Sequence, residues 1–253
     1  MANRLFLRGL LVSALSLVAF SASADDWSYQ FELYGLAATI EGEAGVGRVA
    51  GADVNVDFGD ILDVLDMAFM GRFEAHHNNG WGVALDYGFM KLSDDITGPR
   101  GGVLDVRVRQ GILEALLVRR TQSGDQLIDY FAGLRWWDND LDATFDPAVL
   151  PGTTSVSINE DWIDPVIGAR WTNPLNEKWS FMLHGDIGGL GIGSDFTASA
   201  IAGFRYRIKE SMELDLQYKV LWVDYETGTA GQPGFYKFDT TMHGPVLGLI
   251  FKF

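Results

Sequence analysis

The sequence predicts an all-β fold, a transmembrane antiparallel up-and-down β-barrel of about ten strands, with eight or twelve as the alternatives. Segments of about ten residues or more alternate between apolar and polar side chains, which is the period of a β-strand. Connections of a few residues alternate with long ones, as short periplasmic turns and long outer loops do in such barrels. After its first residues the chain has no apolar run long enough for a spanning helix, so a membrane span requires a closed barrel.

The amino-terminal residues, 1–24, have the parts of a secretory signal peptide. Arg4 and Arg8 precede an apolar run that ends at Phe20, and small residues follow up to Ala24. The run is shorter than the roughly 20 residues that a spanning helix needs. We expect cleavage after Ala24, with an uncleaved anchor as the alternative, and one barrel domain over 25–253.

Composition excludes several classes of function. Of the 19 basic residues two lie in the expected signal peptide, so the mature chain has 17 against 34 acidic residues, a net charge of −17. Such acidity argues against nucleic acid as a partner. The chain has no cysteine, which excludes disulfides and thiolate chemistry. We expect no cofactor and no dedicated metal site, and no signal indicates an oligomeric state.

The first strand is expected at 27–40, because apolar and polar residues alternate along it. A long insert follows at 41–65, glycine-rich at first. Within it, the spacing of Ile61, Leu62 and Leu65 fits one or two helical turns. Two interpretations of the insert are open: a lid folded into the barrel mouth, or a mobile outer loop.

Two features mark the following segments. Asn78-Asn79-Gly80 predicts a tight hairpin turn, because Asn-Gly readily adopts positive φ. The alternation slips near Gly111, which predicts a β-bulge. The remaining strands are expected at 66–77, 81–92, 103–120, 126–142, 158–172, 178–188, 196–206, 212–225 and 243–253.

The last strand carries the most specific signal. Phe253, Phe251, Leu249 and Leu247 alternate with smaller or mixed residues up to the end of the chain. This pattern resembles the carboxy-terminal strand of Gram-negative outer-membrane β-barrels, where the terminal aromatic residue is read by the barrel-assembly machinery. The resemblance covers the whole mature chain and is of the general OmpA or OmpW architecture.

Two further segments, 59–63 and 162–170, look like those of uncharacterised outer-membrane barrel families. The resemblance implies a bacterial outer-membrane location. It also implies contact with outer-membrane lipid and lipopolysaccharide, and the assembly machinery as a partner during biogenesis. It carries no activity and no catalytic residue.

Orientation decides the chemistry of the interior. Aromatic residues near both strand ends predict two girdles, at Trp81, Trp171 and Trp179 and at Tyr87, Trp136 and Trp222. If the apolar face meets lipid, mixed charges fill a narrow lumen, either as a salt-bridged plug or as a narrow polar channel. A soluble sandwich or lipocalin-like barrel with apolar faces inward is the alternative. The expected lumen charges are Arg72, Glu74, Asp86, Asp105, Arg107, Arg109, Asp129, Arg135, Asp164, Arg170, His184, Asp186, Arg205, Asp215 and Lys219.

One combination of residues suggests hydrolysis. His184 and Asp186 share a face, and Ser199 lies on the next expected strand, so a Ser/His/Asp site is conceivable. No nucleophile motif accompanies them, and a histidine paired with a carboxylate in a polar lumen is more often structural. We therefore expect no catalytic residue and a non-enzymatic barrel with an envelope-structural or surface role, or narrow passage of small polar solutes. A surface-exposed lipid or peptide hydrolase is the alternative.

The run Asp138-Asn139-Asp140-Leu141-Asp142 looks like the start of a calcium loop. It departs from the EF-hand pattern, because Ala143 stands where glycine is required and Val149 where glutamate is required. We expect an acidic outer rim instead, solvated or bridged to lipopolysaccharide by divalent ions.

Overall fold

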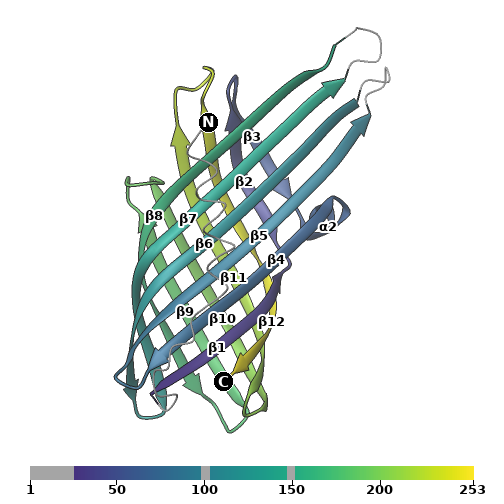
Figure 1. Ribbon diagram of the computed structural model, residues 1–253. Helices are drawn as coiled ribbons and strands as arrows, with labels where there is room; N and C mark the ends of the chain where they lie inside the picture. The colour runs from purple at the N-terminus through teal and green to yellow at the C-terminus, as the bar shows by residue number, and fades with distance from the viewer. Residues whose placement is uncertain (1–25, 98–102, 147–151) are drawn as a thin grey trace.

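A computed structural model describes residues 26–97, 103–146 and 152–253, and the expected signal peptide lies outside these ranges. The strands form one antiparallel sheet in which β1 pairs with both β4 and β12, so the sheet closes on itself (Figure 1). Ten strands close the ring in chain order, which confirms the predicted fold class. They are β1 (Trp27–Leu36), β4 (Leu65–His77), β5 (Trp81–Thr97), β6 (Val103–Ser123), β7 (Gln126–Asp146), β8 (Thr154–Pro174), β9 (Trp179–Gly189), β10 (Phe196–Lys209), β11 (Met212–Thr227) and β12 (Tyr236–Lys252).

The ring closes through the last strand. Phe31 lies opposite Phe251 and Leu33 opposite Leu249, and the backbone amide and carbonyl of Phe253 bond to Tyr29. The expected alternation holds here, because Phe251 and Leu249 face outward while Ile250 between them is completely buried. The apolar residues of the terminal pattern therefore form the outer face of the last strand, β12.

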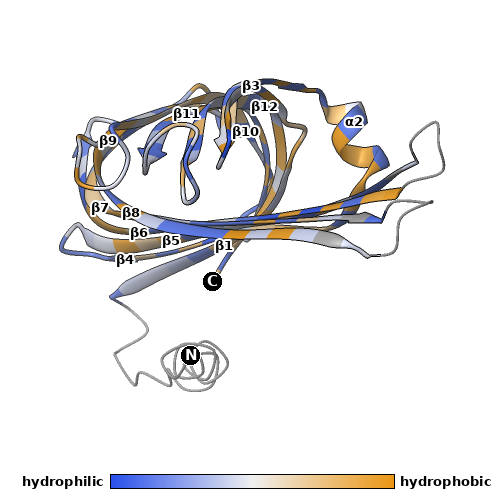
Figure 2. Cartoon of the chain, turned by 90° about the horizontal axis from the view of Figure 1, so that it is seen from above, coloured by the Kyte–Doolittle hydropathy of each residue, from blue (hydrophilic) through white to orange (hydrophobic). Residues whose placement is uncertain are grey.

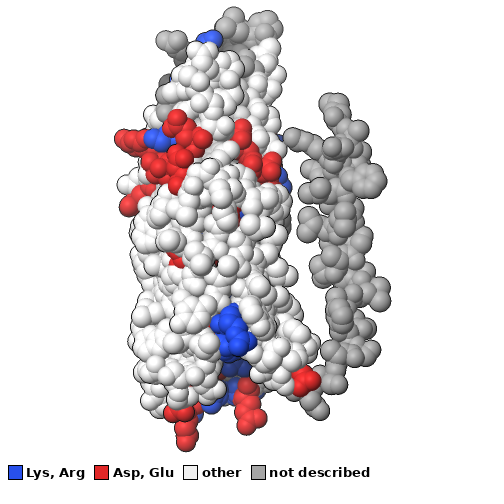
Figure 3. All heavy atoms as spheres, turned by 90° about the vertical axis from the view of Figure 1, so that its left-hand side faces the viewer, with Lys and Arg blue, Asp and Glu red and all other residues white. Residues whose placement is uncertain are grey.

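The outer surface is apolar over a broad belt. Large apolar side chains such as Leu247 and Ile167, 59% and 61% exposed, stand on it, and Figure 3 shows an almost uncharged band between charged groups at the two ends. Exposure of so many apolar residues suits a lipid solvent and not water. The alternative of a soluble barrel with apolar faces inward is therefore wrong. No helix in the described ranges is long and apolar enough to cross a membrane.

The insert after β1 differs from the expectation. The first strand ends at Leu36, and the chain then forms a hairpin of β2 (Thr39–Val46) and β3 (Val49–Val56), with β2 bonded to the upper half of β12. A short helix, α2 (Phe58–Asp63), follows, as the apolar spacing predicted. Asp57 caps it: the Asp57 side chain accepts from the backbone of Asp60, and the Asp60 side chain accepts from the backbone of Asp57. The sequence prediction missed the hairpin, because its glycines hide the alternation.

The strands β5 to β8 are longer than expected. They continue past the apolar belt and rise above the rest of the barrel (Figure 1), so residues 93–97, 143–146 and 154–156, which were predicted as loop, are strand. The predicted bulge at Gly111 is also wrong, because the pairing runs without a shift from Phe89 through Gly111 to Asp138. The Asn-Gly turn is confirmed, and Gly80 has a φ of +86°.

The hairpin β2–β3 lies outside the ring of ten strands, so its removal should leave the ring intact. Thr39 and Val56 lie at the same end of the hairpin, since Ile40 pairs with Val56. We expect a variant with residues 41–55 replaced by a two-residue Asn-Gly turn to fold in vesicles. The measurement is electrophoretic mobility before and after boiling. An unboiled variant that already migrates as unfolded chain would show that closure depends on the hairpin.

Candidate functional site

The lumen collects most of the charged residues that the sequence predicted to lie inside. Alternation along the paired strands directs twelve of them inward, from Arg72 and Glu74 on β4 to Asp215 and Lys219 on β11. Arg107, Arg109 and Asp105 were predicted there wrongly. They face outward above the apolar belt, where Arg107 is 57% exposed and pairs with Asp105. The assumed slip at Gly111 caused this error, because the true alternation continues through that glycine.

The lower lumen is crossed by an arginine fork. Arg170 on β8 holds Glu74 on the opposite wall through two hydrogen bonds of 2.5 and 2.7 Å. Its Nη2 also donates to Asp129 at 2.7 Å. The Asp129 carboxylate accepts two further hydrogen bonds from Arg120, one at each oxygen. Glu74 further accepts from Arg72 at 2.6 Å. These charge-assisted bonds tie β4, β6, β7 and β8 together across the barrel.

A second centre lies at Arg135, a side chain with no exposed surface. Its Nε donates to Glu114 at 2.7 Å, one terminal nitrogen to Asp186 at 2.8 Å and the other to Thr197 at 2.9 Å. Three directions of the guanidinium are thus used, and the partners come from β6, β9 and β10. A buried arginine so surrounded is stabilised, whereas loss of it would leave two carboxylates unpaired in low dielectric.

Sequence reasoning missed some members of this network. Glu114 and Arg120 lie beyond Gly111 on β6, where the assumed bulge put them out of phase. Glu32 and His76 share the polar faces of their strands but were left out of the set. His76 bonds Glu74 at 2.9 Å. Uninterrupted alternation through Gly111 would have found the two on β6.

His184, Asp186 and Ser199 do come together, on neighbouring strands β9 and β10. His184 Nε2 lies 2.9 Å from Asp186, and the Ser199 hydroxyl donates to the same carboxylate oxygen. The serine is therefore held by the aspartate and not by the histidine, so the imidazole does not face the hydroxyl as it does in a catalytic triad. Phe131 stacks on the imidazole at 4.8 Å between ring centres. The trio forms part of the buried network.

The upper lumen is apolar and aromatic. Trp162 stacks on Tyr225 of the opposite wall with 3.9 Å between ring centres, and Trp137 stacks on Trp162 at 5.4 Å. Both indole nitrogens donate to Asp164, which also accepts from a backbone amide, so this buried carboxylate is satisfied without an arginine. Ile61 of α2, only 4% exposed, packs in the same cluster. The other residues of α2 are exposed, and the helix lies at the side of the barrel (Figure 2), so Ile61 anchors it to the wall and the helix is not folded into the mouth as the lid interpretation required.

The acidic run after Trp137 lies on a strand and not in a loop. Asp138 and Asp140 face outward on β7, and Arg109 binds both. Residue 149, one of the two positions that departed from the calcium pattern, lies outside the described residues. Within the described ranges no cluster of three or more acidic or histidine side chains could hold a metal ion.

Comparison with known proteins gives the fold. The outer membrane protease OmpT of Escherichia coli has 9% sequence identity, covers 91% of this chain and 98% of its own, and has a TM-score of 0.54. The translocator domain of the autotransporter NalP of Neisseria meningitidis has 12% identity, coverage of 98% and 96%, and a TM-score of 0.50. No protein-family model and no curated protein sequence matches the chain. The chain therefore has the fold of an outer-membrane β-barrel.

Removal of Arg135 should destabilise the barrel severely. We expect Arg135→Met to lower the free energy of unfolding by about 3–5 kcal/mol, because Glu114 and Asp186 lose their cation in a buried site. Arg207→Met is the matched control: Arg207 is half-exposed with its acid 3.8 Å away, and should cost less than about 1 kcal/mol. Urea unfolding in lipid vesicles measures both. Equal costs would contradict a buried, interdependent network.

Proposed function

We propose that this chain is an integral barrel of the bacterial outer membrane that does not conduct and has no catalytic step. Its role is structural, as part of the cell envelope, or lies in contacts made by its outer surface. The observation that carries the proposal is that side-chain contacts bridge the lumen at two levels. The Arg170–Glu74 fork joins opposite walls at the lower level, and the Trp162–Tyr225 stack does so at the upper level. This arrangement supports the plug over the narrow polar channel that the sequence left open.

The partners follow from the surface. The uncharged belt suits acyl chains (Figure 3). On the acidic rim Asp138 and Asp140 are paired with Arg109, so a divalent ion that bridges to a lipopolysaccharide phosphate would bind a single exposed carboxylate such as Asp142. The last residues, Phe251 and Phe253, remain the expected signal for the assembly machinery. The outer-membrane location rests on the fold, on the belt and on the expected signal peptide.

The plug is tested by ion conductance in planar bilayers. We expect no stepwise currents from the protein, and we expect currents from the double variant Glu74→Ala with Arg170→Ala, because it removes the fork that spans the lower lumen. The control is Asp66→Ala with Lys91→Ala, an exposed pair on the outside of the barrel, which should stay silent. Clear steps from the unaltered protein would overturn the closed-lumen proposal.

Hydrolysis of lipid or peptide is the alternative, which the fold of a protease such as OmpT leaves open. The one candidate trio has its serine bonded to Asp186 and not to His184. We expect no hydrolysis of phospholipid, lipopolysaccharide or peptides by the protein, and the same result from Ser199→Ala. An activity that the protein has and Ser199→Ala lacks would establish the hydrolase in place of the structural role.

A further inference from the structure

Strands β1 and β4 are neighbours that separate in the upper part of the barrel wall. Pairing of β1 with β4 stops at Leu33 opposite Gly71. Above it, β1 continues to Leu36 bonded only to β12, and β4 runs to Leu65 bonded only to β5. We call this gap the seam. An unpaired strand edge is unfavourable in hydrocarbon, so a gap in an otherwise closed ring requires an explanation.

An apolar pocket inside the barrel and a groove outside it meet at the seam. Both are lined by Tyr34, Leu36, Phe58, Leu65, Ala68 and Met70. The groove continues over Leu33, Phe69, Leu216 and Leu247, which stand in the apolar belt. The seam therefore joins the bilayer to the interior, with Phe58 of α2 above it.

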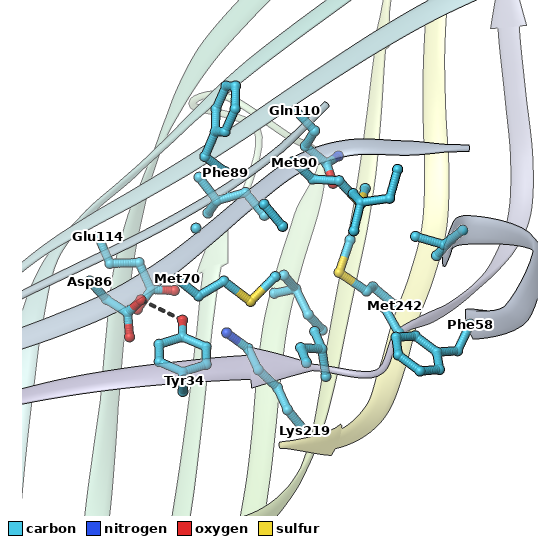
Figure 4. Close-up of a pocket in the computed structure, with 18 residues that line it drawn as sticks. Tyr34, Phe58, Met70, Asp86, Phe89, Met90, Gln110, Glu114, Lys219 and Met242 are labelled. Carbon is cyan, nitrogen blue, oxygen red and sulfur yellow. Dashed lines mark hydrogen bonds between the residues drawn. The ribbon is translucent and has the colours of Figure 1, made fainter. Parts of the chain in front are cut away.

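The inner pocket is apolar along its length and polar at one end. Met90 and Met242 line it towards α2, whereas Tyr34, Asp86 and Lys219 lie together at the other end (Figure 4). The volume open to the centres of water-sized molecules is about 90 Å³, where one bound water needs about 10–15 Å³. This is room for a slender chain but not for a bulky head group.

The cation at the polar end is Lys219, which makes no direct ion pair with a described residue and is attracted at longer range by Glu114 of the same pocket. Asp86 accepts from the Tyr34 hydroxyl at 2.7 Å and lies 3.4 Å from Arg72. Glu114 accepts from Arg135 at 2.7 Å. Each carboxylate thus has its arginine. No carboxylate oxygen in the described ranges lies within 4.0 Å of the Lys219 ammonium.

A second polar group in the pocket also lacks a partner. The Gln110 side chain, 8% exposed, lines the pocket and makes no hydrogen bond to any described residue. Its amide atoms keep some accessible surface, so water or the polar end of a ligand can reach them.

We propose that the inner pocket binds a free long-chain fatty acid, which enters from the bilayer through the seam. Its carboxylate pairs with Lys219, and its chain runs past Met70 and beneath Phe58 to the lipid-facing groove. A phospholipid fits poorly, because its two chains and large head group exceed the pocket. An uncharged alcohol of the same length would leave Lys219 without an anion.

The test uses palmitic acid that carries a mid-chain diazirine, added to the full chain in lipid nanodiscs and activated by light. We expect cross-links on the lumen-facing Met70, Met90 and Met242, competed by palmitic acid but weakly by hexadecanol or palmitoyl lysophospholipid. Cross-links confined to the lipid-facing Leu33, Phe69 and Leu247 would overturn the proposal. Equal competition by hexadecanol, or stronger competition by the lysophospholipid, would overturn it as well.

Variants check the two ends of the site. Lys219→Gln should weaken palmitic acid binding about tenfold, the effect of losing one charge-assisted hydrogen bond, whereas Lys91→Gln outside the barrel should not. Ala68→Trp should block the seam and abolish the inner cross-links, whereas Phe69→Trp beside it faces lipid and should keep them. Unchanged binding in Lys219→Gln would refute the proposal. Mobility before boiling confirms that each variant is folded.

Discussion

Hydrogen bonding of the backbone in hydrocarbon is the constraint on which the rest of this structure depends. Lipid offers no partner to a free amide, so the sheet has to close, and closure joins the last strand to the first through Leu249 opposite Leu33. Closure also fixes which face is inside, because side chains alternate along every strand. The apolar belt and the charged lumen are two consequences of the same ring.

Placing many charges in so narrow a ring sets the chemistry of the lumen. Uncompensated ions in low dielectric are expensive, and arginine offsets this with several fixed donors. Arg135 and Arg170 each reach two carboxylates from different strands. A network satisfied in this way bridges the lumen from wall to wall, which supports the proposed plug. The aromatic layer above it bridges the lumen a second time.

Much of this could be predicted from the sequence, and the failures share a cause. The alternation of apolar and polar residues predicted the barrel, the ring closure and twelve of the charged lumen positions. It could do so because one face of each strand meets lipid and the other meets the polar lumen. It failed where the two faces do not differ in this way: above the belt both faces of β5 to β8 meet water, so the strand ends were misplaced. Arg107 and Arg109 were misplaced by the slip assumed at Gly111, and the hairpin β2–β3 was missed because its glycines hide the alternation. Contacts such as Arg170 to Glu74 join residues 96 positions apart, and no local pattern encodes them.

The insert after β1 explains why the wall is incomplete between β1 and β4. Its first strand, β2, takes the upper half of β12, so β1 ends at Leu36, and above Gly71 β4 pairs with β5 but has no neighbour on its other side. The chain must then return to β4, and it does so through α2, which buries Ile61 in the barrel and leaves Phe58 at the gap. Backbone pairing is replaced there by apolar side chains, which can separate without breaking a hydrogen bond. The stretch of wall without backbone bonds between β1 and β4 is thus where we propose that an apolar molecule enters, and it adjoins the apolar level of the lumen rather than the ionic one.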